Sequence, residues 1–289
     1  MDVFAPPSAN ETLEEARARN VRDALREDVG TGDPTALLVP SRAVTARVLV
    51  REDAVLCGRD WFEGCVRALD PAATVAWDYD EGADMAADTR VCDVHGDGRA
   101  LLSAERPALN FLQLLSGTAT TVRRHVRAIA GASPNPRGCA VLDTRKTLPG
   151  LRQAQKHAVR VGGGASQRMA LWDGILIKEN HIAAAGGVAA ALAAAAELDA
   201  GVEVQIEVET LDQLRDALAA GATSVLLDNF TLSRMRDAVA LTAGRALLEA
   251  SGAVTLERLR EIAATGVDRI SIGALTKDVR AVDYSMRVV

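Results

Sequence analysis

The stretch at residues 202–230, "VEVQIEVETLDQLRDALAAGATSVLLDNF", decides the fold. Its first residues alternate between apolar and polar side chains, which predicts a strand. A segment with apolar residues at helical spacing follows, opening at Thr210 and closing at Gly221, as helices often do. A second apolar run, 224–230, predicts another strand. Strand, helix and strand in this order predict a β-α-β unit within a parallel sheet.

The same pattern continues on both sides of this stretch. Further strands are expected at 139–144, 174–180, 246–252 and 269–275, and further helices at 187–198, 231–244 and 255–266. Strands that alternate with helices so regularly favour an α/β barrel, complete or incomplete, over a doubly wound sheet. The glycines of "VGGGASQR" (161–168) lack the spacing of a dinucleotide-binding turn, so no such site is expected.

The first third of the chain has a different pattern. A helix is expected over 11–30, followed by strand-like runs at 43–58, 74–80, 91–98 and 99–106 and by one or two helices over 107–131. The "HGDG" at 95–98 resembles a tight hairpin turn between two of these strands. An α+β unit of mostly antiparallel strands is therefore predicted, and the alternating tail 279–289 is expected to return to its sheet.

Charge and cysteine usage exclude several classes of protein. The chain has 289 residues and a formal net charge of −6, which argues against nucleic acid or an anionic membrane as the main partner. No two of the four cysteines are spaced as C-x-x-C and the four histidines are scattered, so no zinc site is expected. Residues 1–20 contain no apolar signal-peptide core, and the Ala-rich stretch 183–200 is too short to span a membrane, so a cytoplasmic protein is predicted.

One region is cationic within this acidic chain. Between residues 143 and 180 seven basic residues face three acidic ones, so the region carries a charge of 7 − 3 = +4. Such a concentration favours a pocket for a small anion, with simple solvation of a loop as the alternative for Arg145 and Lys146. A lysine inside the strand "GILIKEN", Lys178, is rarely buried without a partner or a task, and an ion pair with Asp228 is the structural alternative.

Distinctive polar residues and glycines follow the predicted strands at their carboxyl ends, where barrel enzymes place their active sites. They are Arg145, Lys146, Lys178, Gln205, Glu207, Asp228, Ser251, Gly252 and Gly273. Carboxylates that point into a barrel need cations, hydroxyls or a metal as partners. Two ligand groups are therefore predicted: an anion beside the basic residues, and a phosphorylated sugar, with Mg²⁺, beside the acids and glycines.

Several long motifs resemble the quinolinate phosphoribosyltransferase family. They are "DTRKTLPGLRQAQKHAVRVGGG" (143–164), "LIKENHI" (176–182), "LLDNF" (226–230), "LEASG" (248–252) and "ISIGALTKD" (270–278), with "ALREDVGTGDPT" (24–35) and "ERPALNFLQLLSG" (105–117) in the first domain. The resemblance implies an N-terminal α/β sandwich over 1–115, joined by strand 279–289, and an incomplete parallel α/β barrel of the type II phosphoribosyltransferase kind over 116–278.

The resemblance also implies a reaction. Quinolinate and 5-phosphoribosyl 1-diphosphate would give nicotinate mononucleotide, diphosphate and CO₂ with Mg²⁺, in the biosynthesis of NAD, in a homodimer whose Arg106 completes the partner's site. Quinolinate would be bound by Arg106, Thr144, Arg145, Lys146, Gln167, Arg168 and Lys178. The phosphoribosyl diphosphate would be bound by Gln205, Glu207, Asp228, Ser251, Gly252, Gly273 and Lys277, with Mg²⁺ near Asp228 and Glu207. Catalytic roles would fall to Lys146, Lys178 and Asp228.

Three positions depart from the family pattern. Family members often read "GGGxNHR", whereas this chain has Ser166 and Gln167 at the Asn and His positions, and Gln205 stands where a glutamate is common. Three other functions therefore stay open: a phosphoribosyltransferase for another pyridine acid such as nicotinate, a Schiff-base aldolase using Lys178, and a non-catalytic phosphosugar-binding homologue.

Overall fold

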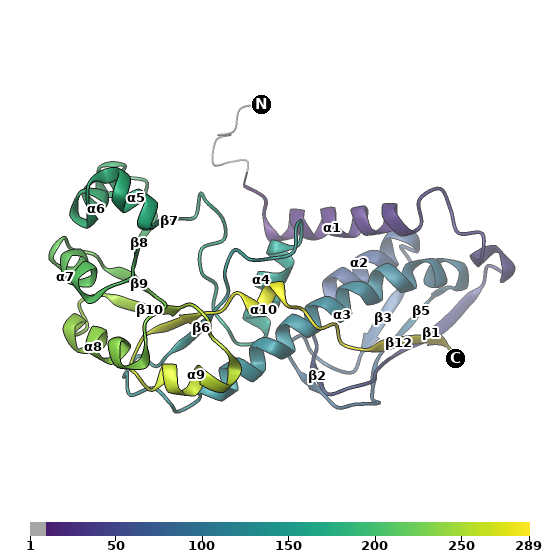
Figure 1. The fold of residues 1–289 in the computed structure, drawn as a ribbon. Coiled ribbons are helices and arrows are strands. Elements are labelled where there is room, and N and C mark those ends of the chain that lie inside the picture. The colour runs from purple at the N-terminus through teal and green to yellow at the C-terminus, as the bar shows by residue number, and fades with distance from the viewer. Residues whose placement is uncertain (1–9) are drawn as a thin grey trace. The chain divides into compact units, whose positions relative to one another are not determined.

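The structure, a computed structural model, describes residues 10–289 (Figure 1). The prediction about a signal peptide rests partly on residues 1–9, which lie outside the described residues. Two compact units are present. The N-terminal unit comprises the described residues up to Arg123 together with Thr147–Gly163 and Ala274–Val289, and the barrel unit comprises Arg124–Lys146 and Gly164–Gly273.

These units divide the chain differently from the predicted boundaries of 1–115 with 279–289 and 116–278. A single helix, α3 (Gly98–Ile129), runs through the predicted boundary at residue 115. The segment Thr147–Gly163 clusters with the N-terminal unit because its helix α4 (Arg152–Val161) packs against α1 (Leu13–Asp28) and α10 (Ala274–Lys277).

Antiparallel strands form the main sheet of the N-terminal unit, in the order β12-β1-β5-β3. They are β12 (Tyr284–Val288), β1 (Ala43–Val50), β5 (Arg90–Asp97) and β3 (Thr74–Trp77), and a second small sheet pairs β2 (Ala54–Val55) with β4 (Asp84–Met85). The short 3₁₀ helix η2 (Ala36–Leu38) precedes β1. Alternate residues of β1, Ala46, Val48 and Val50, are buried in one apolar core with Trp61 of α2 (Arg59–Leu69).

The prediction of a hairpin turn at 95–98 and a strand at 99–106 was wrong, because residues 95–97 continue β5 and α3 begins at Gly98. Asp97 acts as the N-terminal cap, since its Oδ1 accepts hydrogen bonds from the backbone N–H groups of Arg99 (3.0 Å) and Ala100 (3.1 Å). Leu101, Ala104 and Ala108 are buried at a spacing of three and four residues, which is the spacing of one helix face.

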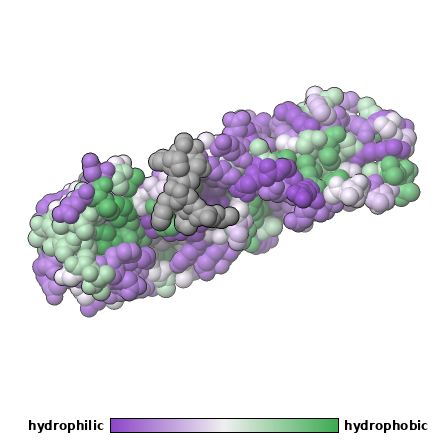
Figure 2. Space-filling model, turned by 90° about the horizontal axis from the view of Figure 1, so that it is seen from above, coloured by the Kyte–Doolittle hydropathy of each residue, from purple (hydrophilic) through white to green (hydrophobic). Residues whose placement is uncertain are grey.

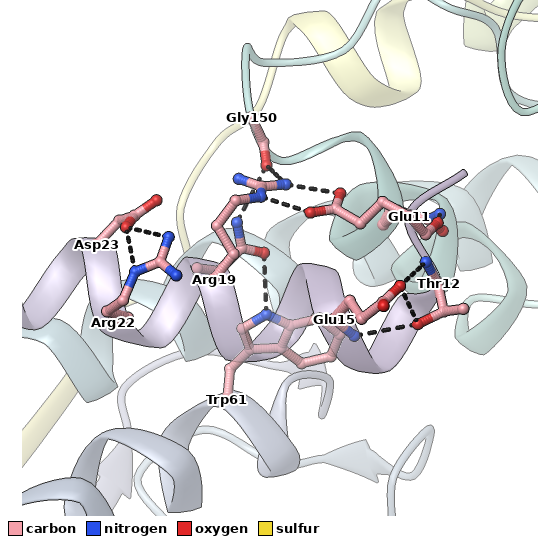
Figure 3. Close-up of polar contacts among 10 residues, drawn as sticks. Glu11, Thr12, Glu15, Arg19, Arg22, Asp23, Trp61 and Gly150 are labelled. Carbon is pink, nitrogen blue, oxygen red and sulfur yellow. Dashed lines mark hydrogen bonds and ion pairs between the residues drawn. The ribbon is translucent and has the colours of Figure 1, made fainter. Parts of the chain in front are cut away.

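Helix α1 fixes the turn at Gly150 within the same unit (Figure 3). The side chains of Arg19 and Asn20 both donate to the Gly150 carbonyl oxygen, at 3.1 and 3.0 Å. Asn20 in turn accepts a hydrogen bond from the buried indole of Trp61 at 3.3 Å. The Pro-Gly turn after the cationic motif is therefore anchored to the core of the N-terminal unit.

The barrel unit confirms the six predicted parallel strands. They are β6 (Ala140–Leu142), β7 (Gly174–Ile177), β8 (Glu203–Val208), β9 (Ser224–Asp228), β10 (Leu247–Ser251) and β11 (Arg269–Ser271), hydrogen-bonded in the order β6-β11-β10-β9-β8-β7. Read in a circle, this is sequence order with the pairing between β6 and β7 missing. The barrel is therefore incomplete, with its opening between these two strands.

Side-chain contacts show that this sheet is strongly curved. Arg269 of β11 donates to Glu203 of β8 at 3.3 Å across two intervening strands. In a flat sheet those strands would lie ~14 Å apart, too far for such a contact, because adjacent strands are spaced by ~4.8 Å. The helices that cover the outer side of the strands are α5 (Glu179–Ala185), α6 (Val188–Glu197), α7 (Leu211–Ala219), α8 (Leu232–Thr242) and α9 (Leu256–Ala263) (Figure 1).

The surface carries mixed polarity. Figure 2 shows one face on which hydrophilic residues are interrupted by hydrophobic patches. Among residues 10–289, no helix combines the length and apolar character needed to cross a membrane.

Gly117 in α3 provides a test of the packing in the N-terminal unit. A Cβ atom there would overlap the backbone carbonyl of Arg280, which cannot move aside as a side-chain end can. We expect Gly117→Ala to lower the free energy of unfolding by at least about 1–3 kcal/mol in chemical denaturation. Gly98→Ala, where the nearest atoms would lie at 3.5 Å, is the matched control and should leave stability nearly unchanged. Equal stability of the two variants would contradict this packing.

Candidate active site

The carboxyl ends of the six strands bring most of the predicted site residues to one edge of the barrel unit. In sheet order, this edge carries Thr144 and Lys146 after β6, Gly273 after β11, Ser251 and Gly252 at β10, Asp228 at β9, Glu207 near the end of β8, and Lys178 after β7. We call this set the carboxyl edge. The predicted juxtaposition of cations, acids and glycines is therefore present in the sheet topology itself.

The cationic end of the carboxyl edge is closely packed. The Lys146 backbone N–H donates to Thr144 Oγ1 at 3.0 Å, which turns the chain directly after β6. The stem of Lys146 crosses Gly273, because a Cβ atom on that glycine would lie 2.8 Å from Lys146 Cδ. A side chain at 273 would therefore displace the Lys146 stem from this position.

Lys178 forms an ion pair with Glu207 at 2.8 Å, and not with Asp228 as the structural alternative predicted. The Glu207 side chain is 11% exposed and the Lys178 side chain 45%, so the carboxylate lies deeper than the ammonium group. Lys178 is also the residue that precedes α5, and its backbone N–H donates to His181 Nδ1 at 3.0 Å. The ammonium group and the backbone N–H of Lys178 are thus both held by neighbouring side chains.

Asn229, which no sequence argument singled out, organises the acidic part of the edge. Its side-chain amide donates to Asp228 Oδ2 at 2.8 Å, and its backbone N–H donates to the Ser251 carbonyl at 3.1 Å. Its φ of +55° is left-handed, which Asn tolerates better than most residues. Gly252, with φ +126°, lies against the Asn229 side chain with no room for a Cβ atom.

Gln205 lies below the carboxyl edge, in the interior of the barrel, and not at the strand end where the sequence placed it. Its amide donates to Glu249 Oε2 at 2.9 Å and to Ser224 Oγ at 3.3 Å, and its Oε1 accepts from Gln167 Nε2 at 3.3 Å. Gln205 and Glu249 are both almost fully buried. Two of the positions that depart from the family pattern, 167 and 205, are therefore in direct contact.

Burial raises the pKa of Glu249, and hydrogen bonds from Gln205 and Ser271 only partly oppose this shift. The sequence did not identify Glu249 as a site residue, because only Ser251 and Gly252 of "LEASG" were predicted to lie at the end of the strand. A polar residue between two apolar ones on a predicted inner strand, as in 248–250, was the available signal.

Asp143 was also missed as a site residue, although it is fully buried. Its carboxylate accepts hydrogen bonds from Ser166 Oγ at 3.1 Å and from the Gln167 backbone N–H at 3.0 Å. Ala165 forms a parallel bridge with Leu142, so the segment after the glycines runs beside β6. These contacts fix the start of the segment that carries Gln167 and Arg168.

The expectation that Arg145, Lys146, Arg168 and Lys178 surround one point is not met, because Arg168 points elsewhere. Its guanidinium donates to the carbonyl of Gly174 at 2.7 Å, at the amino end of β7, whereas Lys178 follows the opposite end. Burial lowers the pKa of Arg168, and the nearby charge of Arg145 lowers it further. Repulsion between two guanidinium groups and an available carbonyl acceptor account for this orientation.

A cavity lies at the amino ends of β7, β8 and β11. It is lined by Ser166, Gln167, Arg168, Met169, Asp173, Gly174, Ile175, Glu203, Gln205 and Arg269. Gln167 and Arg168 therefore face this cavity in the structure.

Two predicted residues belong to the N-terminal unit. Arg106 lies in α3 and donates to Gln113 Oε1 at 3.4 Å, and Lys277 ends α10 and pairs with Asp278 at 3.2 Å.

Asp228 and Glu207 fit the predicted Mg²⁺ in chemistry and position. They come from adjacent strands, and each offers carboxylate oxygens, the donor type that Mg²⁺ prefers. The carboxylate oxygens still have lone pairs for a metal ion, since Glu207 pairs with Lys178 and Asp228 accepts one hydrogen bond from Asn229. One or two carboxylates beside substrate phosphates are a common arrangement for this ion.

An incomplete parallel barrel with this edge of cations, acids and close-packed glycines defines the chain as a phosphoribosyltransferase-type α/β protein. Residues 33–116 match the family described as quinolinate phosphoribosyl transferase, N-terminal domain, and residues 118–287 match its C-terminal domain. The chain belongs to the quinolinate phosphoribosyltransferase family.

Similar proteins agree with this assignment. A probable nicotinate-nucleotide pyrophosphorylase [carboxylating] of Bacillus subtilis is 38% identical, over 91% of this chain and 90% of the relative. A Mycobacterium leprae protein named nicotinate-nucleotide pyrophosphorylase [carboxylating] is also 38% identical, over 94% of this chain and 97% of its own. The structure of the Francisella tularensis nicotinate-nucleotide pyrophosphorylase superposes with a TM-score of 0.91 at 41% identity, covering 99% of this chain and all of the other.

Glu249 provides a test of the buried network. Because the native carboxyl keeps its proton to a higher pH than the unfolded one, whose ordinary pKa is 4.5, the folded state binds more protons in this range. Stability should therefore fall as pH rises from 4.5 toward the native pKa. Glu249→Gln removes this dependence and keeps an acceptor for Gln205, so it should gain stability relative to the natural protein as pH rises. Denaturation from pH 5 to 8 measures the difference, and a pH-independent difference would contradict the assignment.

Proposed function

We propose that this protein transfers the phosphoribosyl group of 5-phosphoribosyl 1-diphosphate to quinolinate with loss of CO₂, giving nicotinate mononucleotide and diphosphate, in the biosynthesis of NAD. The observation that carries the proposal is the carboxyl edge, where cations, acids and close-packed glycines follow consecutive strands of one sheet. Such an edge suits a dicarboxylate beside a phosphorylated sugar.

The cations position quinolinate in this proposal. Arg145 and Lys146, held after β6 by the Thr144 turn, bind its carboxylates, and Lys178 binds from the other end of the edge. Arg168 joins them by exchanging the Gly174 carbonyl for a substrate carboxylate, which also relieves its repulsion from Arg145. Gln167 offers its amide as a donor without a titrating group.

The acids act on the sugar. As diphosphate leaves the ribose C1, positive charge develops on the sugar, and the carboxylates of Glu207 and Asp228 stabilise that charge. Glu207 and Asp228 would also hold Mg²⁺, which would supply positive charge for the diphosphate. Ser251 and the close-packed backbone at Gly252 and Gly273 hold the 5-phosphate. Gln205 supports this group from below through its contact with Glu249.

The bond changes need no covalent enzyme intermediate. The pyridine nitrogen attacks C1, the bond to diphosphate breaks, and the ring nitrogen becomes cationic. The bond from the neighbouring ring carbon to its carboxylate then breaks, CO₂ departs, and the electron pair stays on the ring carbon, stabilised by the positive nitrogen until a proton is added. The cations of the edge hold the other carboxylate throughout.

We extend the proposal to a cytoplasmic homodimer in which Arg106 of one subunit completes the partner's site. This part of the proposal rests on the resemblance to the family, and Arg106 itself lies in the long helix α3 of the N-terminal unit.

One assay tests the reaction. The protein is mixed with quinolinate, 5-phosphoribosyl 1-diphosphate and Mg²⁺, and nicotinate mononucleotide and CO₂ are measured. Both products should form in equal amounts, and a chelator of Mg²⁺ should stop the reaction. Product from nicotinate without CO₂ would favour a different pyridine acid, and binding of both substrates without turnover would favour a non-catalytic homologue. Borohydride trapping of Lys178 with a carbonyl substrate would favour an aldolase.

Arg145→Ala tests the quinolinate site. The substitution leaves a substrate carboxylate unpaired and should weaken quinolinate binding by about 2–5 kcal/mol, measured by calorimetry. Arg236→Ala, an exposed arginine on α8 of the same unit, is the matched control and should bind as the natural protein does. Unchanged affinity in Arg145→Ala would show that the anion binds elsewhere.

A further inference from the structure

Three potential metal ligands meet in the N-terminal unit, and none of them belongs to the carboxyl edge. The Sγ of Cys57, a carboxylate oxygen of Glu81 and a ring nitrogen of His157 all lie within 4.8 Å of one another. Cys57 follows β2, Glu81 lies between β3 and β4, and His157 is in α4. Among residues 10–289 this is the one group of three such side chains close enough to share an ion.

Neighbouring groups hold each of these donors in place. Glu81 Oε1 accepts from the Gly58 backbone N–H at 2.8 Å, Oε2 accepts from the Arg59 N–H at 3.3 Å, and Oε1 lies 3.3 Å from His157 Nε2. Glu81 Oε2 accepts only one of these bonds, and its second lone pair leaves it able to bind a cation. Backbone bonds of this kind orient metal-binding carboxylates in known sites.

Cys57 and His157 are similarly fixed. The Ser116 hydroxyl bonds to both the backbone N–H and the carbonyl of Cys57, at 3.0 and 3.1 Å, and itself accepts from the Tyr284 hydroxyl at 2.8 Å. The His157 ring packs on Trp61 with centroids 5.4 Å apart. The three donors are thus positioned by rigid neighbours, which lowers the cost of ordering them around an ion.

Burial and charge also suit a divalent cation. Cys57 is fully buried, whereas the side chains of His157 and Glu81 are 25% and 29% exposed, so the cluster is closed at the sulfur and open on the opposite side. A thiolate, a carboxylate and a neutral imidazole would together balance a charge of +2. A bound ion would displace the thiol proton of Cys57, because the thiolate is the form of cysteine that binds metals.

We propose that Cys57, Glu81 and His157 form a binding site for a transition-metal cation of the zinc type, with a fourth, exchangeable position open to solvent. Sulfur and imidazole donors favour Zn²⁺ or Co²⁺, whereas Mg²⁺ prefers oxygen ligands, so this site is chemically distinct from the Mg²⁺ position near Asp228. A bound ion would tie the start of α2, the β3–β4 loop and α4 together within the N-terminal unit.

Cobalt binding tests the proposal on the full-length protein after treatment with a chelator. Co²⁺ bound to a thiolate gives a charge-transfer absorption in the near ultraviolet that carboxylates and imidazoles do not give. We expect one equivalent of Co²⁺ to produce this band and Zn²⁺ to remove it. Cys57→Ser should lose the band, and Cys65→Ser should keep it, because Cys65 is also a buried thiol but lies outside the cluster.

Two further variants keep the test informative if Cys57→Ser does not fold. Glu81→Gln retains oxygen and removes charge, and His157→Gln removes a nitrogen ligand at the partly exposed side. Both should require more Co²⁺ to reach the same absorption, while circular dichroism confirms the fold. Absence of the band in the natural protein, or a band of equal strength and affinity in the Cys57, Glu81 or His157 variants, would overturn the proposal.

Discussion

The barrel unit depends on one buried carboxylate. Asp143 is fully buried, and a buried charge is stable only when its lone pairs are used. It uses them on Ser166 and on the backbone of Gln167, which holds the segment after the glycines alongside β6. The position of Gln167 then allows its amide to reach Gln205, and Gln205 in turn reaches Glu249. A chain of polar contacts thus runs from the open side of the barrel into its interior.

Polar side chains have different roles at the carboxyl edge and in the interior of the barrel. At the edge, charged groups are paired yet partly exposed, as Lys178 and Glu207 are, and therefore stay available to ligands. One layer below, Gln205 and Glu249 are buried and hydrogen-bonded to each other. An uncharged amide at 205 avoids a second buried carboxylate next to Glu249, which like-charge repulsion would make costly. The paired departures at 167 and 205 are therefore physically compatible with one another.

The sequence predicted the periodic strands and helices well, but it predicted poorly how deeply individual side chains are buried. The six strands and the helices opening at Thr210 and Thr231 follow from strong hydrophobic periods and from cap residues whose hydroxyls accept backbone hydrogen bonds. The "HGDG" stretch was wrongly predicted to form a turn. Asp and Gly favour turns, but here they lie at the start of a helix that Asp97 caps. Whether Gln205 lies at the edge or inside depends on a shift of two residues along a strand, which alternation alone does not fix. The Cys57, Glu81 and His157 cluster has no spacing motif, since its members come from three distant segments.

The missing pairing between β6 and β7 leaves two strand edges, which in many proteins template aggregation by recruiting another strand. Here both β6 and β7 have features that limit such pairing. The β6 edge is covered by the bridge from Leu142 to Ala165, and β7 spans only Gly174–Ile177 before a lysine ends it. A foreign strand would find few free backbone groups to bond, so the gap that leaves the barrel incomplete need not make the protein prone to self-association through its sheet.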